Sequence, residues 1–370
     1  MRAVTWQGKK DVQVLDVPDP TIEAPTDAVI RVTSTNICGS DLHLYEPLAP
    51  FMDKGDILGH EPMGIVEEVG TECTNLDVGD RVVIPFQVAC GQCWMCRNGL
   101  TSQCEATQVR EYGTGAALFG YSKLYGQVPG GQAEYLRVPH ADFTSIKVPD
   151  GFSDERFLFL SDVLPTAWQA VEYADVPEEG TLAVLGLGPI GQMCCRIAQS
   201  RGARVIGVDV NSYRISRALK LGLEVVDASE SEDEVADIVR EMTGGRGPDS
   251  VIDAVGMEAH GSPGVSFLHK STGLLPDAVA QPLMLRAGVD RLNAFYTAID
   301  MVRRGGTISL SGVYGGAADP LPMLTLFDKQ IQVRMGQANV KAWVDEILPW
   351  LTDEDALGVD DFASHVLPLE

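Results

Sequence analysis

Residues 181–191 read TLAVLGLGPIG, an apolar run that leads directly into three glycines at fixed spacing. The run is typical of a strand buried in a parallel sheet, and GLGPIG fits the pattern G-x-G-x-x-G at the start of a helical stretch. Gly186 permits a tight turn, Gly188 lets the backbone approach a pyrophosphate, and Gly191 lets helix and strand pack closely. The helix N-terminus then faces the phosphates with its partial positive charge. This context predicts a dinucleotide-binding site.

An acidic residue at the end of the next apolar run, RVIGVDV, bears on the choice of dinucleotide. A carboxylate at Asp209 would accept hydrogen bonds from the ribose hydroxyls and repel a 2′-phosphate, which favours NAD over NADP. Arg214 lies nearby and weakens this preference, because an arginine can bind the extra phosphate. The structural alternative is a glycine-rich turn that serves packing alone, next to a surface Asp.

The pattern of apolar and polar residues changes near residue 150. Before it, short β-like runs such as AVIRVTST and MGIVEEVG are broken by Gly and Pro, and long helical patterns are scarce. After it, apolar runs such as DSVIDAVG and GGTISLSGV alternate with helical stretches, as in a parallel sheet that is covered on both faces. We therefore predict an α/β protein with two domains, an irregular β domain followed by a doubly wound domain.

Half of the eight cysteines lie in CGQCWMCRNGLTSQC, residues 90–104. The spacing C-x2-C-x2-C-x7-C lets tight turns direct successive thiolates at one ion, and the fourth thiolate closes a tetrahedron around zinc. A closed site has no exchangeable position, so its predicted role is structural. An iron–sulfur cluster, which usually has Pro after the last Cys, and a site without metal are the alternatives. The predicted ligands are Cys90, Cys93, Cys96 and Cys104.

Composition narrows the class of protein. Fifty-two acidic against 28 basic residues give a formal net charge of −24, which repels nucleic acid phosphates and anionic membrane surfaces. No apolar run reaches the ~18 residues that span a bilayer, and MRAVTWQGKK lacks the apolar segment of a secretory signal. We expect a cytoplasmic protein without nucleic acid or membrane partners. The charge fits both simple solubility and a salt-adapted host.

Several motifs, taken in chain order, resemble those of one family: NICGSDLH, GHE, the four-cysteine lobe, LSDVLPT and GLGPIG. From Met1 to Glu370 the chain resembles the zinc-dependent medium-chain alcohol dehydrogenases, and among them the glutathione-independent formaldehyde dehydrogenases. The resemblance implies a GroES-like catalytic domain at 1–163 and 338–370, and a Rossmann NAD-binding domain at 164–337. Members of that family normally continue with a further helix and strand beyond the position that matches Glu370.

The family binds a catalytic zinc through a Cys, the His of GHE and a third ligand. Cys38 and His60 match the first two, and Asp162 takes the third place, where many alcohol dehydrogenases have Cys. The resemblance also implies that Glu61 lies beside the metal as an alternate ligand. Asp41 matches a carboxylate that orients the zinc-bound His, a support that metal sites commonly have.

An open zinc with three protein ligands keeps one exchangeable position for substrate. By resemblance, a zinc-bound alkoxide of formaldehyde hydrate, a small aldehyde hydrate or a primary alcohol passes a hydride to NAD, and Ser40 and His43 relay the proton. Phe86 is expected to form a wall of the substrate pocket. The alternatives are a secondary alcohol or polyol dehydrogenase and, from another class, a non-catalytic nucleotide-binding protein on the same fold.

The resemblance implies two zinc ions per chain and a homodimer or homotetramer built edge to edge across the nucleotide-binding domains. Residues 257–291 form a predicted insertion, which either covers the adenine side of the cofactor or serves as a loop or subunit contact. Beyond the three glycines and Asp209, the residues expected to contact NAD are Gly39, Ser40, His43, Thr166, Ile190, Arg214, Val255, Gly256, Ser311, Val313 and Gly336.

Overall fold

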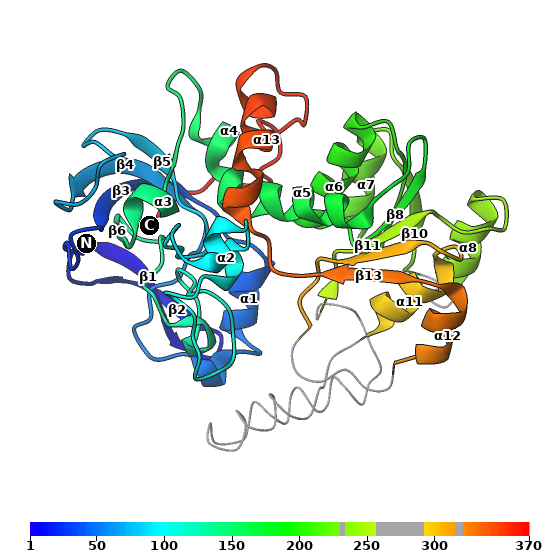
Figure 1. Ribbon diagram of the computed structural model, residues 1–370, viewed down its shortest axis with the longest axis horizontal. Coiled ribbons are helices and arrows are strands. Elements are labelled where there is room, and N and C mark those ends of the chain that lie inside the picture. Colours follow the sequence, from blue (N-terminus) through cyan, green and yellow to red (C-terminus); the bar gives the residue numbers. More distant parts are fainter. Residues whose placement is uncertain (230–233, 257–291, 315–320, 370) are drawn as a thin grey trace. The chain divides into compact units, whose positions relative to one another are not determined.

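In the computed structural model the chain forms two compact units (Figure 1). The first unit comprises Met1–Pro165 and Ala338–Glu370, and the second comprises Thr166–Gln337. The predicted insertion at 257–291 lies outside the described residues. The structure describes residues 1–229, 234–256, 292–314 and 321–369.

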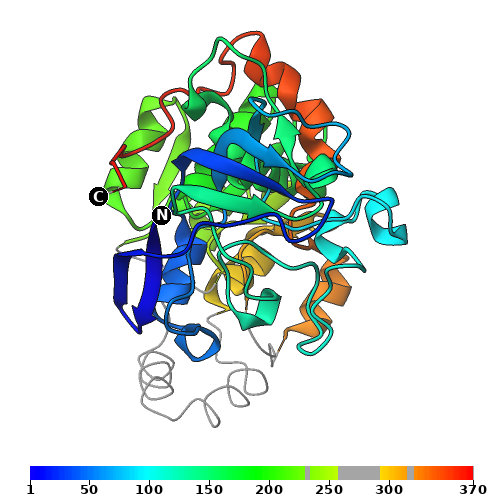
Figure 2. The ribbon, with the colours of Figure 1, turned by 90° about the vertical axis from the view of Figure 1, so that its left-hand side faces the viewer.

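The first unit is built on an antiparallel five-stranded sheet in the order β6-β3-β4-β5-β7. The β3–β4 pairing shifts register twice, so the sheet is irregular, and its buried face packs around Ile30, Val82 and Phe119. A second sheet contains only the pair β1–β2, which Figure 2 shows in dark blue. The strands are β1 (Arg2–Gly8), β2 (Asp11–Asp16), β3 (Ala28–Thr35), β4 (Pro62–Val69), β5 (Arg81–Val83), β6 (Tyr135–Val138) and β7 (Ile146–Lys147).

Most helices of the first unit are short. The chain re-enters the first unit at Ala338, and the longer helix α13 follows. Asn339, just before α13, is anchored because its Oδ1 accepts hydrogen bonds from the backbone and hydroxyl of Ser102 at 3.0 and 2.9 Å. The helices are α1 (Gly39–Tyr45), η1 (Ala49–Phe51), α2 (Trp94–Arg97), η2 (Thr101–Gln103), η3 (Lys123–Tyr125), α3 (Ala141–Thr144), α4 (Asp154–Leu158), η4 (Phe159–Ser161) and α13 (Val340–Thr352).

The second unit contains a six-stranded parallel sheet in the order β10-β9-β8-β11-β12-β13. The chain runs outward from β8 in one direction and then in the other, so the strand order reverses between β8 and β11, where open α/β sheets bind ligands. The strands are β8 (Thr181–Leu185), β9 (Arg204–Asp209), β10 (Glu224–Asp227), β11 (Ser250–Asp253), β12 (Thr307–Leu310) and β13 (Gln332–Met335).

Helices cover both faces of this sheet. Helices α6 and α7 pack on one face, and α8 and α11, which contact each other, pack on the other (Figure 1). Central strands such as β8 and β11 are almost wholly buried because both of their faces are covered, which explains their continuous apolar runs. The predicted fold class is thus confirmed. The helices are α5 (Val163–Ala174), α6 (Pro189–Ser200), α7 (Ser212–Lys220), α8 (Val235–Met242), α11 (Asn293–Met301) and α12 (Met323–Lys329).

Candidate active site and metal centres

Cys38 is held at the N-terminus of α1 by a reciprocal cap. Its Sγ accepts a hydrogen bond from the backbone of Ser40 at 3.4 Å, while a carboxylate oxygen of Asp41 accepts one from the backbone of Cys38 at 2.9 Å. Such a capping box satisfies the free N–H groups of the first helical turn. The thiol therefore sits on a helix end, where the partial positive charge favours a thiolate.

His60 brings together three other side chains of the first unit. Its Nε2 lies 3.1 Å from the Sγ of Cys38 and 3.4 Å from an oxygen of Asp162, and its Nδ1 lies 3.4 Å from an oxygen of Asp41. These residues come from the start of α1, the segment before β4 and the end of η4. The fold thus collects one sulfur, one imidazole nitrogen and one carboxylate from distant segments.

Glu61 lies beside Cys38, His60 and Asp162, but its hydrogen bonds come from other side chains. Asn36 donates to the Glu61 Oε2 at 3.0 Å, and Ser161 lies 3.4 Å from the same oxygen. The other oxygen, Oε1, is buried, accepts no hydrogen bond from a described residue and lies 3.7 Å from His60 Nε2. Sequence reasoning missed Asn36, although it begins the NICGSDLH motif, because its role depends on a contact with a residue far along the chain.

The electrostatics of this group call for a cation. Burial raises the pKa of the Cys38 thiol to about 12, against the opposing effect of His60. Burial disfavours a charged His60, but Cys38 and Asp41 outweigh it and raise the imidazole pKa well above its ordinary value. Burial, and then the charge of Asp162, raise the pKa of Glu61. A divalent cation next to these groups would favour the ionised forms of Cys38 and Glu61, which burial disfavours.

The donor atoms also fit zinc by distance. Cys38, His60, Glu61 and Asp162 each offer one ligand atom, and these atoms lie within 4.8 Å of one another. A tetrahedral zinc with bonds of about 2.0–2.3 Å separates its ligand atoms by about 3.3–3.7 Å. The contacts that His60 makes are close to that range. The sulfur, nitrogen and oxygen donors are those of catalytic zinc sites.

The four-cysteine lobe forms a second candidate metal site in the first unit. The sulfurs of its four cysteines lie within 4.8 Å of one another, and all eight cysteines of the chain are free thiols. The Sγ of Cys93 accepts hydrogen bonds at 3.4 Å from the backbone of Cys96 and of Glu105. Burial opposes ionisation of Cys93, but these two amides overcome it and lower its pKa. Four sulfurs gathered in this way suit a structural zinc.

The glycine motif takes the geometry that a phosphate-binding turn requires. Gly186 has φ of +84°, and a Cβ at Gly191 would lie 1.8 Å from the carbonyl oxygen of Gly186, so only glycine fits there. A Cβ at Gly188 would meet only the Arg214 guanidinium, at 3.9 Å. Gly188 therefore leaves open space at the start of α6, next to Ile190, where a pyrophosphate is able to approach.

Asp209 has a structural contact that its sequence position did not reveal. Its Oδ2 accepts a hydrogen bond from the backbone of Leu187 at 2.6 Å, and its Oδ1 accepts one from Asn211 at 2.7 Å. The guanidinium of Arg214 lies 3.7 Å from the Oδ2. The carboxylate is buried and ties the end of β9 to the glycine turn.

The other residues expected at the cofactor fall into both units. Gly39, Ser40 and His43 lie on α1 of the first unit, and Ser40 and His43 share a face because they are three positions apart. Phe86 is buried in the same unit, and its backbone donates to the carbonyl of Ser161, next to Asp162. The residues in the second unit are Thr166 on α5, Val255 and Gly256 after β11, Ser311 and Val313 after β12, and Gly336 after β13.

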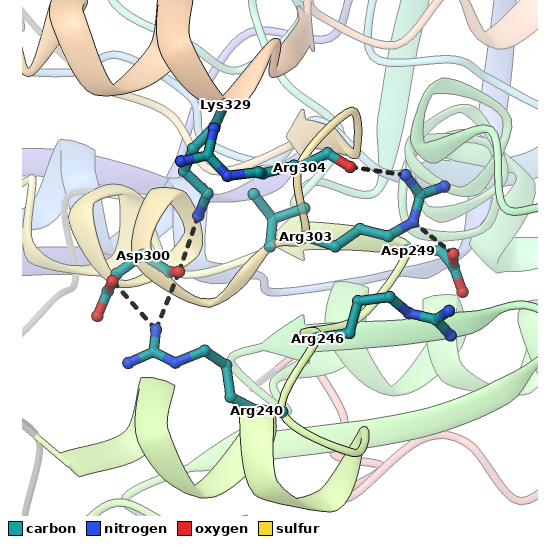
Figure 3. A pocket seen from close by; sticks show the side chains of 9 residues that line it. Arg240, Arg246, Asp249, Asp300, Arg303, Arg304 and Lys329 are labelled. Carbon is teal, nitrogen blue, oxygen red and sulfur yellow. Dashed lines mark hydrogen bonds and ion pairs between the residues drawn. The ribbon is translucent and has the colours of Figure 1, made fainter.

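A hollow of roughly 660 Å3 lies at the end of the parallel sheet where the strands begin, away from the glycine turn (Figure 3). Several cations line it, and some of them cap helix ends: Lys329 donates to the carbonyls of Ile299 and Asp300, and Arg304 donates to that of Asp328. Cations at helix C-termini are favourable for structural reasons alone. None of the predicted site residues lines this hollow, so it is separate from the candidate active site.

Comparison with known proteins identifies the family. Residues 24–150 match the alcohol dehydrogenase GroES-like domain, and residues 189–273 match the zinc-binding dehydrogenase domain. The chain is 42% identical to an uncharacterized zinc-type alcohol dehydrogenase-like protein, AdhB, of Bacillus subtilis, over 100% of this chain and 94% of that protein. The chain therefore belongs to the zinc-dependent medium-chain alcohol dehydrogenases, and it is an oxidoreductase with small-molecule substrates.

Two further relatives place it within this family. It is 35% identical to the glutathione-independent formaldehyde dehydrogenase of Pseudomonas aeruginosa, over 85% of this chain and 75% of that protein. Its structure is similar to that of the alcohol dehydrogenase TADH from Thermus sp. ATN1, with a TM-score of 0.82 and 34% identity over 100% of this chain and 94% of that one. Among the described residues, no helix is long and apolar enough to cross a membrane.

Proposed function

We propose that this protein is a zinc- and NAD-dependent dehydrogenase that oxidises formaldehyde hydrate, small aldehyde hydrates or primary alcohols. The observation that carries the proposal is the set of donor atoms from Cys38, His60 and Asp162. Three protein ligands of mixed chemistry leave a position for substrate, whereas the four-cysteine lobe has no such position. The first site is therefore proposed as catalytic and the second as structural, with two zinc ions per chain.

The residues around the catalytic site divide the work. Zinc, when bound, acts as a Lewis acid that lowers the pKa of a substrate hydroxyl. Asp41 holds His60 through the Nδ1 side, so the Nε2 faces the metal position. The buried Oε1 of Glu61 lies beside the ligands and accepts no hydrogen bond from a described residue, while Asn36 donates a hydrogen bond to Oε2. Glu61 is thus proposed as an alternate ligand.

Ser40 and His43 are proposed as the proton path. Both lie on α1, whose first residue follows the ligand Cys38, and they share one face of that helix. A proton released at the metal position has to leave a site whose walls are largely buried. A hydroxyl and an imidazole in series both accept and donate protons, which a path of this kind requires. Phe86 is proposed as an apolar wall that restricts the pocket to small substrates.

NAD is proposed as the hydride acceptor in preference to NADP. The buried carboxylate of Asp209 stands at the end of β9, beside the glycine turn. A 2′-phosphate there would face a negative charge, and Arg214 is already within 3.7 Å of the same carboxylate. The arginine is therefore partly neutralised and less able to receive a phosphate. The other cofactor contacts named above remain predictions.

The edge of the second unit supports a homo-oligomer. Strand β13 ends the parallel sheet, and all four of its residues are exposed. An exposed edge strand offers unpaired backbone groups to another copy of the sheet. Helix α12 next to it exposes Leu324 and Phe327 at 80% and 81%. We propose that a second copy pairs along β13 and covers these side chains, in a dimer or tetramer.

A substrate panel tests the proposed activity. Purified protein loaded with zinc is assayed on formaldehyde, ethanol, 2-propanol and sorbitol, with NAD and with NADP. The proposal expects turnover of formaldehyde or ethanol with NAD. Faster turnover of 2-propanol or sorbitol would establish a secondary alcohol or polyol dehydrogenase instead. Dinucleotide binding without turnover of any alcohol or aldehyde would indicate the non-catalytic nucleotide-binding protein.

A further inference from the structure

Asp253 is a fully buried carboxylate that no catalytic assignment uses. It is the last residue of β11, at the C-terminal end of the parallel strands, and is 0% exposed. Its Oδ1 accepts hydrogen bonds from the backbone of Val255 at 2.9 Å and of Gly256 at 3.3 Å. The side chain therefore turns the residues after β11 back over the end of their own strand, as Asp does in an Asx-turn.

The same residue also holds the neighbouring loop. The backbone carbonyl of Asp253 accepts hydrogen bonds from Ser311 at 3.0 Å and Gly312 at 2.9 Å, the residues that follow β12. The hydroxyl of Tyr314, a few positions further on, donates to the Oδ2 of Asp253. Asp253 thus joins the loops after β11 and β12 through both its backbone and its side chain.

These loops pack against each other and against the glycine turn. A Cβ at Gly312 would lie 2.3 Å from the nitrogen of Gly256, and a Cβ at Gly186 would lie 2.8 Å from the Cγ2 of Val255. Backbones this close tolerate little displacement. Val255 therefore faces the first glycine of the dinucleotide motif, across the point where the strand order reverses between β8 and β11.

The hydrogen bonds around Asp253 suit an ionised carboxylate. Burial raises its pKa, while the Tyr314 hydroxyl and the amides of Val255 and Gly256 oppose that shift. Three donors directed at one carboxylate stabilise its charged, acceptor-only form. Loss of a single acceptor atom would leave a buried N–H or O–H group without its partner, which is costly in a site closed to water.

We infer that Asp253 is a positioning residue for the dinucleotide: together with Tyr314, it fixes the loops after β11 and β12 as the wall that faces the glycine turn. The inference rests on the proposed binding of NAD. It assigns no contact between Asp253 and the cofactor, because the side chain is buried beneath the loops. Its effect on the reaction is expected through cofactor binding and orientation, with the zinc ligands unaffected.

The test compares three variants of the full zinc-loaded protein. Asp253→Asn keeps the volume but removes one acceptor, and Tyr314→Phe removes only the hydroxyl. Asp249→Asn is the matched control, because Asp249 lies just before the same strand and also holds a backbone amide, that of Thr181 at 2.9 Å, but at the opposite edge of the sheet (Figure 3). Measurements are NADH binding by fluorescence, zinc content, melting temperature and hydrogen exchange of the two loops.

We expect Asp253→Asn to weaken NADH binding about tenfold, a change of about 1.4 kcal/mol. Tyr314→Phe should weaken it less, both variants should keep two zinc ions, and exchange should quicken at residues 255–256 and 311–312. Asp249→Asn should lower the melting temperature and leave NADH affinity unchanged.

Two results would overturn the inference while parent protein binds NADH. One is an unchanged affinity in Asp253→Asn, and the other is an equal loss in Asp249→Asn, which would show general destabilisation. A parent protein that binds no dinucleotide would instead contradict the proposed function itself.

Discussion

Asp209 accepts a hydrogen bond of 2.6 Å from the backbone of Leu187, inside the glycine motif. The end of β9 and the turn after β8 are thereby joined by a single buried carboxylate. The residue proposed to select NAD is thus also part of the scaffold that shapes the glycine turn. A substitution there has to remove the charge while it preserves an acceptor.

Asp209→Asn meets this condition. The amide oxygen remains able to accept from Leu187, although the backbone of Asn211 loses its acceptor. The negative charge proposed to repel a 2′-phosphate is lost, and Arg214 is released from its neighbour. We expect the ratio of kcat/KM for NADP to that for NAD to rise about tenfold, or about 1.4 kcal/mol. Asp227→Asn, at the end of the adjacent strand β10, is the control and should leave the ratio unchanged. An unaltered ratio in Asp209→Asn would remove the basis for the NAD preference.

Substitution of Asp162 should remove zinc from the proposed catalytic site and leave the four-cysteine site occupied. Asp162→Ala is expected to lower the zinc content from two ions to one per chain, because His60 and Cys38 alone hold zinc weakly. Activity should fall at least about 100-fold, since even residues one step removed from a metal cost about 10- to 100-fold. Metal analysis by mass spectrometry and a standard kinetic assay provide the readouts.

Cys96→Ser is the reciprocal control. It should remove the other zinc and destabilise the lobe, because metal binding supplies folding free energy to such sites. Two zinc ions retained in Asp162→Ala would show that Asp162 is not a ligand. One zinc ion in the parent protein would leave only the four-cysteine site.

The exposed edge of the second unit predicts the effect of charge on assembly. Leu324→Asp combined with Phe327→Asp places two carboxylates where we propose that a second copy packs. We expect the protein to shift from dimer or tetramer to smaller species in light scattering at micromolar concentration, since desolvation of unpaired charges is costly. Leu367→Asp alters an equally exposed leucine of the first unit and should leave the mass unchanged. A parent protein that is already monomeric contradicts the proposed interface.

Lys341 predicts a pH-dependent stability. Burial lowers its pKa from 10.5 to about 8, although its Nζ donates to the carbonyl of Ser145 at 2.9 Å and lies over the ring of Phe143. The folded state therefore binds fewer protons than the unfolded state between about pH 8 and the ordinary lysine pKa. Within that window the free energy of unfolding rises with pH, and below it the full cost of burying the charge is present.

The comparison uses Lys341→Met. Between pH 8 and pH 10 the parent should gain about 2 kcal/mol of stability relative to this variant, from roughly 1.4 kcal/mol for each pH unit. Urea unfolding at several pH values measures the difference, and Lys54→Met, an exposed lysine of the same unit, is the control. A difference that is constant with pH would show that Lys341 has an ordinary pKa.

Local spacing was sufficient for the fold class and for the two most compact motifs. The glycine motif and the four cysteines are each contiguous, so a short segment determines most of their geometry. Continuous apolar runs such as TLAVL predicted a parallel sheet covered on both faces, and strands β8 and β11 are buried in this way. Even strand β3 coincides with the run AVIRVTST, because alternation and β-branched residues determine it locally.

Contacts between distant segments could not be predicted from local spacing. Nothing in the residues around Cys38, His60 and Asp162 by themselves showed that these three side chains meet, and only resemblance to a family grouped them before the fold brought their donor atoms within 4.8 Å. The roles of Asn36 and Asp253 had no sequence pattern at all. Each depends on a hydrogen bond to a partner that only the packed chain brings near.

The sequence by itself determined that a β domain with a four-cysteine cluster precedes a doubly wound sheet with a glycine-rich turn, because each of these features arises from residues next to one another. Only the tertiary structure decided that Asp209 braces the glycine turn, that Asn36 restrains Glu61 and that Asp253 binds two loops together. Hydrogen bonds and metal coordination act over about 2–3 Å, so they depend on where packing places the side chains, whatever their separation along the chain.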